Sequence, residues 1–81
     1  MKVYVTVTAH YTLEGIVLPM AFTWEDGKVY RIERVKKVSR LNGSGPDEDR
    51  IMYTCLVKGR DTHLYHEIGE RGRWFLERKN V

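Results

Sequence analysis

The sequence has little cysteine and no long hydrophobic run. Its single cysteine, Cys55, permits no intramolecular disulfide and cannot build a thiolate zinc site by itself. No stretch approaches the roughly 20 apolar residues that a membrane helix needs, and residues 1–10 alternate where a signal peptide would be continuously apolar. We therefore expect a cytoplasmic protein with no membrane partner, whose stability comes from packing.

The rest of the composition is typical of one small globular domain. The chain has 81 residues, of which 42% are hydrophobic and 31% charged, a balance that fits a folded protein and excludes wholesale disorder. A chain this short holds one core and folds with little margin of stability. Its formal charge of +3 is too weak a signal by itself to assign a nucleic-acid partner. We predict a single β domain over residues 1–81, with a flexible loop at 42–49.

Side chains alternate with period two along almost the whole chain, and no stretch has the spacing of an amphipathic helix. This pattern predicts an all-β fold, which glycine, proline and acidic residues divide into six strands. Five of them are expected at residues 2–11, 16–24, 28–38, 50–57 and 73–78. The remaining strand is expected between a turn at 59–60 and a loop at 70–72. Without a helix, these strands bury one sheet face by curling. We expect a six-stranded antiparallel curled sheet or half-open barrel of the SH3-like or OB-like kind.

The hydrophobic pattern also predicts how the strands pair at three hairpins. A two-residue turn at 26–27 would place charge beside the apolar face, so a three-residue loop with a left-handed Gly27 is favoured instead. The expected pairs are Phe22 with Tyr30 across the loop at 25–27, Cys55 with Leu64 and Tyr53 with His66 across the turn at 59–60, and Ile68 with Trp74 and His66 with Leu76 across the loop at 70–72.

These pairings sort the aromatic residues onto two sheet faces. Tyr53, Cys55, His66 and Trp74 are expected to share a dry interior, because side chains on one face recur at every second residue. The opposite face carries Leu56, Tyr65 and Phe75. The sequence does not decide which of the two faces the barrel hides, and the face that stays outside is the candidate interface.

Three segments of the chain resemble a family. They read Phe22-x-Trp24-x-x-Gly27-x-x-Tyr30-x-Ile32-x-x-Val35, then Met52-Tyr53-Thr54-Cys55-Leu56, then Gly72-Arg73-Trp74-Phe75-Leu76-Glu77-Arg78. This pattern of aromatics, glycines and aliphatics, over about residues 20–79, is similar to small uncharacterised bacterial proteins sometimes encoded beside Y-family, lesion-bypass DNA polymerases. The resemblance implies an accessory role near DNA repair, with no catalytic signature.

The histidines and Cys55 invite an enzyme or metal-site interpretation, which the spacing opposes. His63 and His66 lie three apart on one expected strand, so their side chains point to opposite faces and cannot share one ion. Cys55 falls between inward residues, where a free thiol behaves as a small hydrophobe rather than a nucleophile activated by His66. No phosphate loop or serine elbow occurs. We predict no catalytic residues, no metal, no cofactor and no enzyme activity.

The strongest functional signal is a basic segment. Residues 28–40 hold six cations against one acid, Glu33. Together with Tyr65 and Phe75, a segment like this suits binding of single strands by charge and stacking, although lysine and arginine also serve simply to solvate a strand and to blunt an exposed edge. The candidate partner-binding residues are Arg31, Arg34, Lys36, Lys37, Arg40, Tyr65 and Phe75.

The sequence therefore supports three ranked hypotheses. The first is a non-enzymatic interaction module with a protein partner, linked to bacterial DNA repair through the resemblance. The second is a small β-barrel that binds single-stranded nucleic acid and gives salt-sensitive binding. The third is a metal or thiol enzyme centred on His63, His66 and Cys55. The identity of the partner and the oligomeric state are left open.

Overall fold

The structure is a computed structural model that describes residues 1–45, 48–69 and 71–78. Its described residues form strands and connecting loops, with no helix that could span a membrane. Every strand pairing is antiparallel, so the predicted all-β class is confirmed. The strands are β1 (Lys2–Tyr11), β2 (Val17–Thr23), β3 (Val29–Arg31), β4 (Arg34–Leu41), β5 (Arg50–Val57), β6 (Arg60–Glu67) and β7 (Trp74–Glu77).

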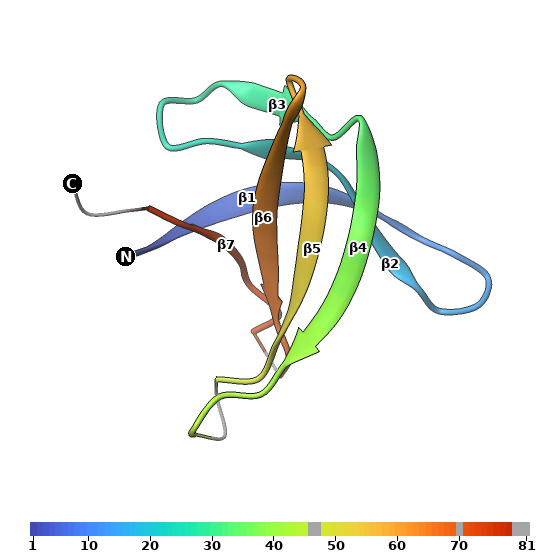
Figure 1. The fold of residues 1–81 in the computed structure, drawn as a ribbon, viewed down its shortest axis with the longest axis vertical. Coiled ribbons are helices and arrows are strands. Elements are labelled where there is room, and N and C mark those ends of the chain that lie inside the picture. Colours follow the sequence, from blue (N-terminus) through green and yellow to red (C-terminus); the bar gives the residue numbers. More distant parts are fainter. Residues whose placement is uncertain (46–47, 70, 79–81) are drawn as a thin grey trace.

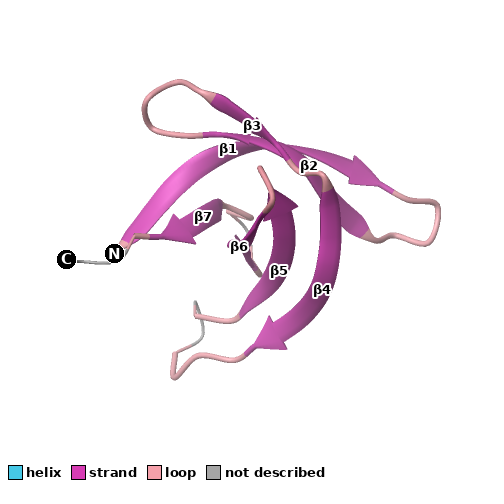
Figure 2. Ribbon diagram, turned by 45° about the horizontal axis from the view of Figure 1, so that its top comes forward, coloured by secondary structure: helices cyan, strands magenta, loops and turns pink. Residues whose placement is uncertain are grey.

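The strands form one curled sheet in the order β3-β2-β1-β7-β6-β5-β4. The long strand β1 pairs with β2 on one side and with β7 on the other, so it joins the two wings of the sheet (Figure 1). The sheet curls strongly (Figure 2). Its two outermost strands, β3 and β4, are consecutive in the chain and do not pair with each other, which leaves a half-open barrel.

The strand expected at residues 28–38 is in fact two strands, so the sheet has seven strands rather than six. The break lies at Ile32 and Glu33. The Ile32 amide donates to the Met20 carbonyl of β2, whereas the next amide, that of Glu33, donates to the Leu56 carbonyl of β5. The chain thus changes partner strand at a corner, and buried Ile32 anchors that corner in the core.

The β2–β3 hairpin has the predicted register. Phe22 pairs with Tyr30, and their rings stack with centroids 5.4 Å apart. The Trp24 amide donates to the Lys28 carbonyl across the loop. Gly27 has a φ of 85°, a left-handed conformation that costs glycine little. The three-residue loop with a left-handed glycine is therefore confirmed.

The β5–β6 register differs from the prediction by two residues. The turn residues are Lys58 and Gly59, with φ of 50° and 75°, rather than Gly59 and Arg60. Positive φ at both central positions is the type I′ geometry, whose twist matches that of the flanking strands. Tyr53 consequently pairs with Leu64 instead of His66. A shift of two keeps every side chain on its predicted face.

The β6–β7 register is also shifted by two residues. His66 pairs with Trp74, not with Leu76, and the expected pairing of Ile68 with Trp74 is wrong. Ile68 leaves the ladder because its amide donates to the Asp49 carbonyl at the end of the 42–49 loop. Within that loop, residues 46–47 lie outside the described residues.

The core lies on the inner, concave face, and its buried members come from most of the strands. Tyr53 and Cys55 are buried there, as predicted. His66 and Trp74 are only half-buried, so the expectation that all four residues share a dry interior is wrong for these two. Both rings border an open cavity on this face. The main buried cluster comprises Phe22, Ile32, Tyr53, Cys55, Val57, Leu64 and Leu76.

Candidate functional site

The outer, convex face carries a row of three aromatic rings on adjacent strands, which we call the outer aromatic row: Tyr4 on β1, Phe75 on β7 and Tyr65 on β6. Tyr4 pairs with Phe75, and Phe75 with Tyr65, so all three side chains share one face. Tyr65 stacks on Phe75 with centroids 5.0 Å apart, while Tyr4 meets Phe75 edge-on at 5.8 Å. Phe75 is 0% exposed and Tyr4 is 44% exposed. Phe75 therefore supports its two neighbours and offers no surface of its own.

Cations lie over each ring of the outer aromatic row. The Lys2 ammonium is 4.8 Å from the Phe75 centroid, the Arg50 guanidinium 5.7 Å from that of Tyr65, and the Arg73 guanidinium 4.2 Å from that of Tyr4. A cation over a ring face is attracted by the ring quadrupole. The row is thus a surface of rings and positive charge together.

Glu67 holds one end of this surface in place. Its carboxylate accepts a hydrogen bond from Arg73 Nε at 2.9 Å and one from the Tyr4 hydroxyl at 3.2 Å. The ion pair keeps the Arg73 guanidinium over the Tyr4 ring. Glu67 therefore orients a cation and a ring on the outer face.

The basic segment reaches the same face through an irregularity in β4. Arg34 pairs with Leu56 and Lys37 with Thr54, which both lie on the outer side of β5, and the register shifts between Val35 and Lys37. Without that bulge, Arg34 and Lys37 would point to opposite faces. Lys36, the extra residue, reaches Asp61 on β6 at 2.9 Å. Three of the predicted cations therefore join Tyr65 on the outer face.

Arg31 and Arg40 lie apart from this group. Arg31 pairs with Ala21 on the other wing, beyond the corner that ends β3. Arg40 pairs with Ile51, on the inner side of β5, and forms an ion pair with Asp49 at 3.5 Å. The seven residues proposed from the sequence do not form one continuous patch.

The histidines and Cys55 do not assemble into a catalytic group. His63 shares a 3.2 Å hydrogen bond with Thr54 on the outer face, whereas His66 lies on the inner face. Burial raises the pKa of the Cys55 thiol to about 11, and the side chain is 1% exposed. Within the residues that the structure describes, no three His, Cys, Asp or Glu side chains gather closely enough to hold a metal ion.

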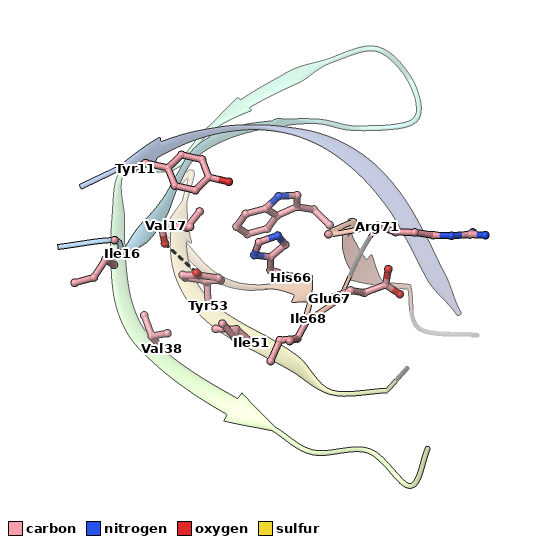
Figure 3. A pocket seen from close by; sticks show the side chains of 14 residues that line it. Tyr11, Ile16, Val17, Val38, Ile51, Tyr53, His66, Glu67, Ile68 and Arg71 are labelled. Atoms are coloured by element: carbon pink, nitrogen blue, oxygen red, sulfur yellow. Dashed lines mark hydrogen bonds between the residues drawn. The ribbon is translucent and has the colours of Figure 1, made fainter. Parts of the chain in front are cut away.

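The inner face has a feature that the sequence did not predict, an open cavity of about 650 Å³. Its wall includes Trp74, whose indole stacks on the His66 ring with centroids 3.9 Å apart and planes 4° apart. Tyr53 lies beside them and donates its hydroxyl hydrogen to the Val17 carbonyl at 2.9 Å (Figure 3). The expected registers would have set Ile68 opposite Trp74 and Leu76 opposite His66, whereas His66 pairs with Trp74 itself. No local sequence signal reveals the cavity, because it depends on where β6 and β7 stop pairing.

His66 is held as a neutral ring in this cavity. Desolvation lowers its pKa below the ordinary value, because burial penalises the imidazolium form. A hydrogen bond with the Gly72 backbone and the charge of Glu67 act in the opposite direction. At pH 7 the ring therefore has one donor and one acceptor nitrogen.

Comparisons with known proteins do not assign a function to this chain. No protein-family model, no curated protein and no solved structure matches the chain. The outer aromatic row with its cations, and the inner cavity with its stacked rings, are the two arrangements whose chemistry suits binding.

Proposed function

We propose that the protein is a non-enzymatic interaction module of the cytoplasm, a small half-open barrel of the SH3-like or OB-like kind, whose outer face binds single-stranded nucleic acid. The observation that carries the proposal is the overlap of rings and cations on one face. Single-strand binders combine a cationic path for the phosphates with aromatic platforms for the bases.

The outer face supplies both parts. Tyr65 and Tyr4 present partly exposed rings at either side of the buried Phe75. The cations stand over the rings and along β4, two strands away from β6. They are Lys2, Arg34, Lys36, Lys37, Arg50 and Arg73.

The rings favour a single strand over a duplex. Paired bases in a duplex keep their faces stacked on each other, so a tyrosine on a sheet gains little from them, whereas an unstacked base gains about 1–3 kcal/mol from an aromatic side chain. The cations contribute a salt-dependent share of the affinity, because phosphate binding releases condensed counterions. Binding is therefore expected to weaken steadily as salt is added.

Fluorescence anisotropy of a labelled single-stranded oligonucleotide tests this proposal. We expect binding at low salt whose logarithmic slope against salt becomes shallower by about 0.7 for each phosphate contact removed. Lys37→Ala on the outer face should weaken binding and reduce the slope. Lys28→Ala is the matched control, because Lys28 is an exposed lysine in the β2–β3 loop, which carries none of the proposed rings or cations. Unchanged anisotropy at low salt, or equal losses in both variants, contradicts the proposal.

A protein partner in bacterial DNA repair is the second candidate. The resemblance to proteins encoded beside lesion-bypass polymerases favours it, and Leu56 and Tyr65 add half-buried apolar surface to the outer face. Such a partner buries Leu56, whereas a nucleic acid relies on the cations. A binding assay with purified Y-family polymerase separates the two: the uncharged variant Leu56→Ser should weaken polymerase binding and leave oligonucleotide binding in place. Failure of the wild-type protein to bind such a polymerase removes this candidate.

A further inference from the structure

We infer that the inner cavity is a binding site for one uncharged planar heteroaromatic ring, which lies against the Trp74 and His66 rings at the open side of the half-barrel. The cavity volume of about 650 Å³ is within the range of small-molecule sites. The inference does not depend on the proposed function, because the outer aromatic row and this cavity lie on opposite faces of the sheet.

Ring geometry at the cavity indicates a planar occupant. The Trp74 indole is stacked with His66 at 3.9 Å and is tilted by 36° to Tyr53 at 5.4 Å. Tyr11, 71% exposed, also lines the cavity and is drawn above Val17 and Tyr53 in Figure 3. Aromatic pairs prefer offset-stacked or edge-on contacts. A flat ring in the cavity makes such contacts with the aromatic side chains that line it.

Polar groups at the cavity indicate that the ring carries hydrogen-bonding atoms. The Tyr53 hydroxyl is already used by the Val17 carbonyl. The His66 ring also lines the cavity and offers an occupant a polar ring nitrogen. A heteroaromatic ring with a donor or acceptor at its edge matches that nitrogen better than a hydrocarbon does.

The charged residues around the cavity indicate an uncharged occupant. The Glu67 carboxylate is held by Arg73 and Tyr4 on the outer face. The Arg71 side chain extends away from the other labelled residues (Figure 3). The Glu67 charge acts on the His66 ring, but its carboxylate is already paired with Arg73, so a charged ligand would lose its hydration without a free ion partner.

The cavity opening is lined by exposed apolar side chains, so an occupant that covers them is stabilised by the hydrophobic effect. Ile16, Val38 and Ile68 line it and are exposed, with Val38 at 52%. A ring seated inside removes part of this surface from water. It also covers Trp74, whose indole the chain leaves half-buried.

Such a ring has two sources, a free small molecule or one base of a nucleic acid. NMR titration of the ¹⁵N-labelled protein with adenosine, indole and cyclohexanol as probes tests the inference. We expect saturable shifts with the two heteroaromatic probes at the Trp74 indole N–H and at the Gly69 and Gly72 amides, and none at the Trp24 indole. An adenine-containing oligonucleotide that shifts the same signals at lower concentration than adenosine identifies a nucleic-acid base; the opposite order identifies a free molecule.

A cavity-filling variant supplies the control. Val38→Phe places a ring in the cavity opening and should weaken probe binding at least about tenfold while the protein stays folded. Val29→Phe is the matched variant, because Val29 is also an exposed strand valine, at 68%, and does not line the cavity. The inference is overturned if no heteroaromatic probe gives saturable shifts, if cyclohexanol binds equally well, or if the two variants behave alike. Loss of oligonucleotide binding in Lys37→Ala tests the proposed function of the outer face and does not test the cavity.

Discussion

The two faces of the sheet each carry an aromatic cluster, and the clusters differ in what covers them. On the outer face, Phe75 lies between Tyr4 and Tyr65 with Lys2 above it, and it has no exposed surface. On the inner face, Trp74 has His66 and Tyr53 beside it and a cavity in front of it. The same kind of side chain thus completes its packing on the convex face and leaves it incomplete on the concave face.

The comparison shows how a small sheet provides binding surface without a second domain. The outer cluster is covered by its own cations, which the proposed single strand would engage without exposing the core. The inner cluster borders an open cavity where Ile68 leaves the β6–β7 ladder. Each face therefore combines buried side chains with exposed surface, the outer face through its cations and the inner face through its cavity.

The largest expected effect is a loss of stability when the outer aromatic row is disrupted. Phe75→Ala removes a fully buried ring and should lower the free energy of unfolding by about 3–5 kcal/mol. Trp74→Ala, on the same strand, should cost clearly less, because its indole is half-buried and already borders a cavity. Denaturant titration of both variants measures the difference. Equal losses would show that the two clusters are packed alike.

A second prediction concerns the fully buried part of the inner face, in contrast to the part that borders the open cavity. Cys55 is buried, and its pKa of about 11 leaves only about one thiol in a thousand ionised at pH 8. We expect native protein to resist alkylation and to react once denaturant unfolds it. Mass spectrometry after iodoacetamide treatment measures the modification. Rapid labelling of the native protein would place Cys55 in water.

The smallest expected effect concerns His66 in the open part. Its folded-state pKa is lowered by desolvation, so the unfolded chain binds the proton more readily. Stability should be unaffected well above the unfolded pKa of about 6.5 and should fall as pH decreases through that value toward the folded pKa. Thermal melts between pH 8 and pH 5, compared with His66→Gln, isolate this contribution. If His66→Gln shows the same pH dependence of stability as the wild-type protein, groups other than His66 cause that dependence.

Local turn chemistry and alternation made part of the fold predictable. The loop at 25–27 follows from Gly27 and from the need to keep charge away from Phe22. Strands β1 and β5 have the expected bounds. The two registers that were wrong are each shifted by two residues, a change that alternation cannot detect because it keeps every side chain on its face.

The features of the fold that the sequence could not predict depend on contacts between residues far apart along the chain. Ile32 continues the alternation, so the corner that splits β3 from β4 leaves no mark in the pattern. One of the rings that cover Phe75, that of Tyr4, lies more than 70 residues away in sequence. The bulge at Lys36 decides that Arg34 and Lys37 share a face. The inner cavity arises where Ile68 leaves the ladder for Asp49.

The most direct measurement of the central claim is an NMR map of the protein bound to a single-stranded oligonucleotide. The Tyr4 and Tyr65 ring signals and the Arg34 and Arg73 Nε–H signals should shift and saturate together, and should recover when salt is raised. A complex that leaves all four unchanged, or no complex at low salt, would contradict a nucleic-acid interface on the outer face.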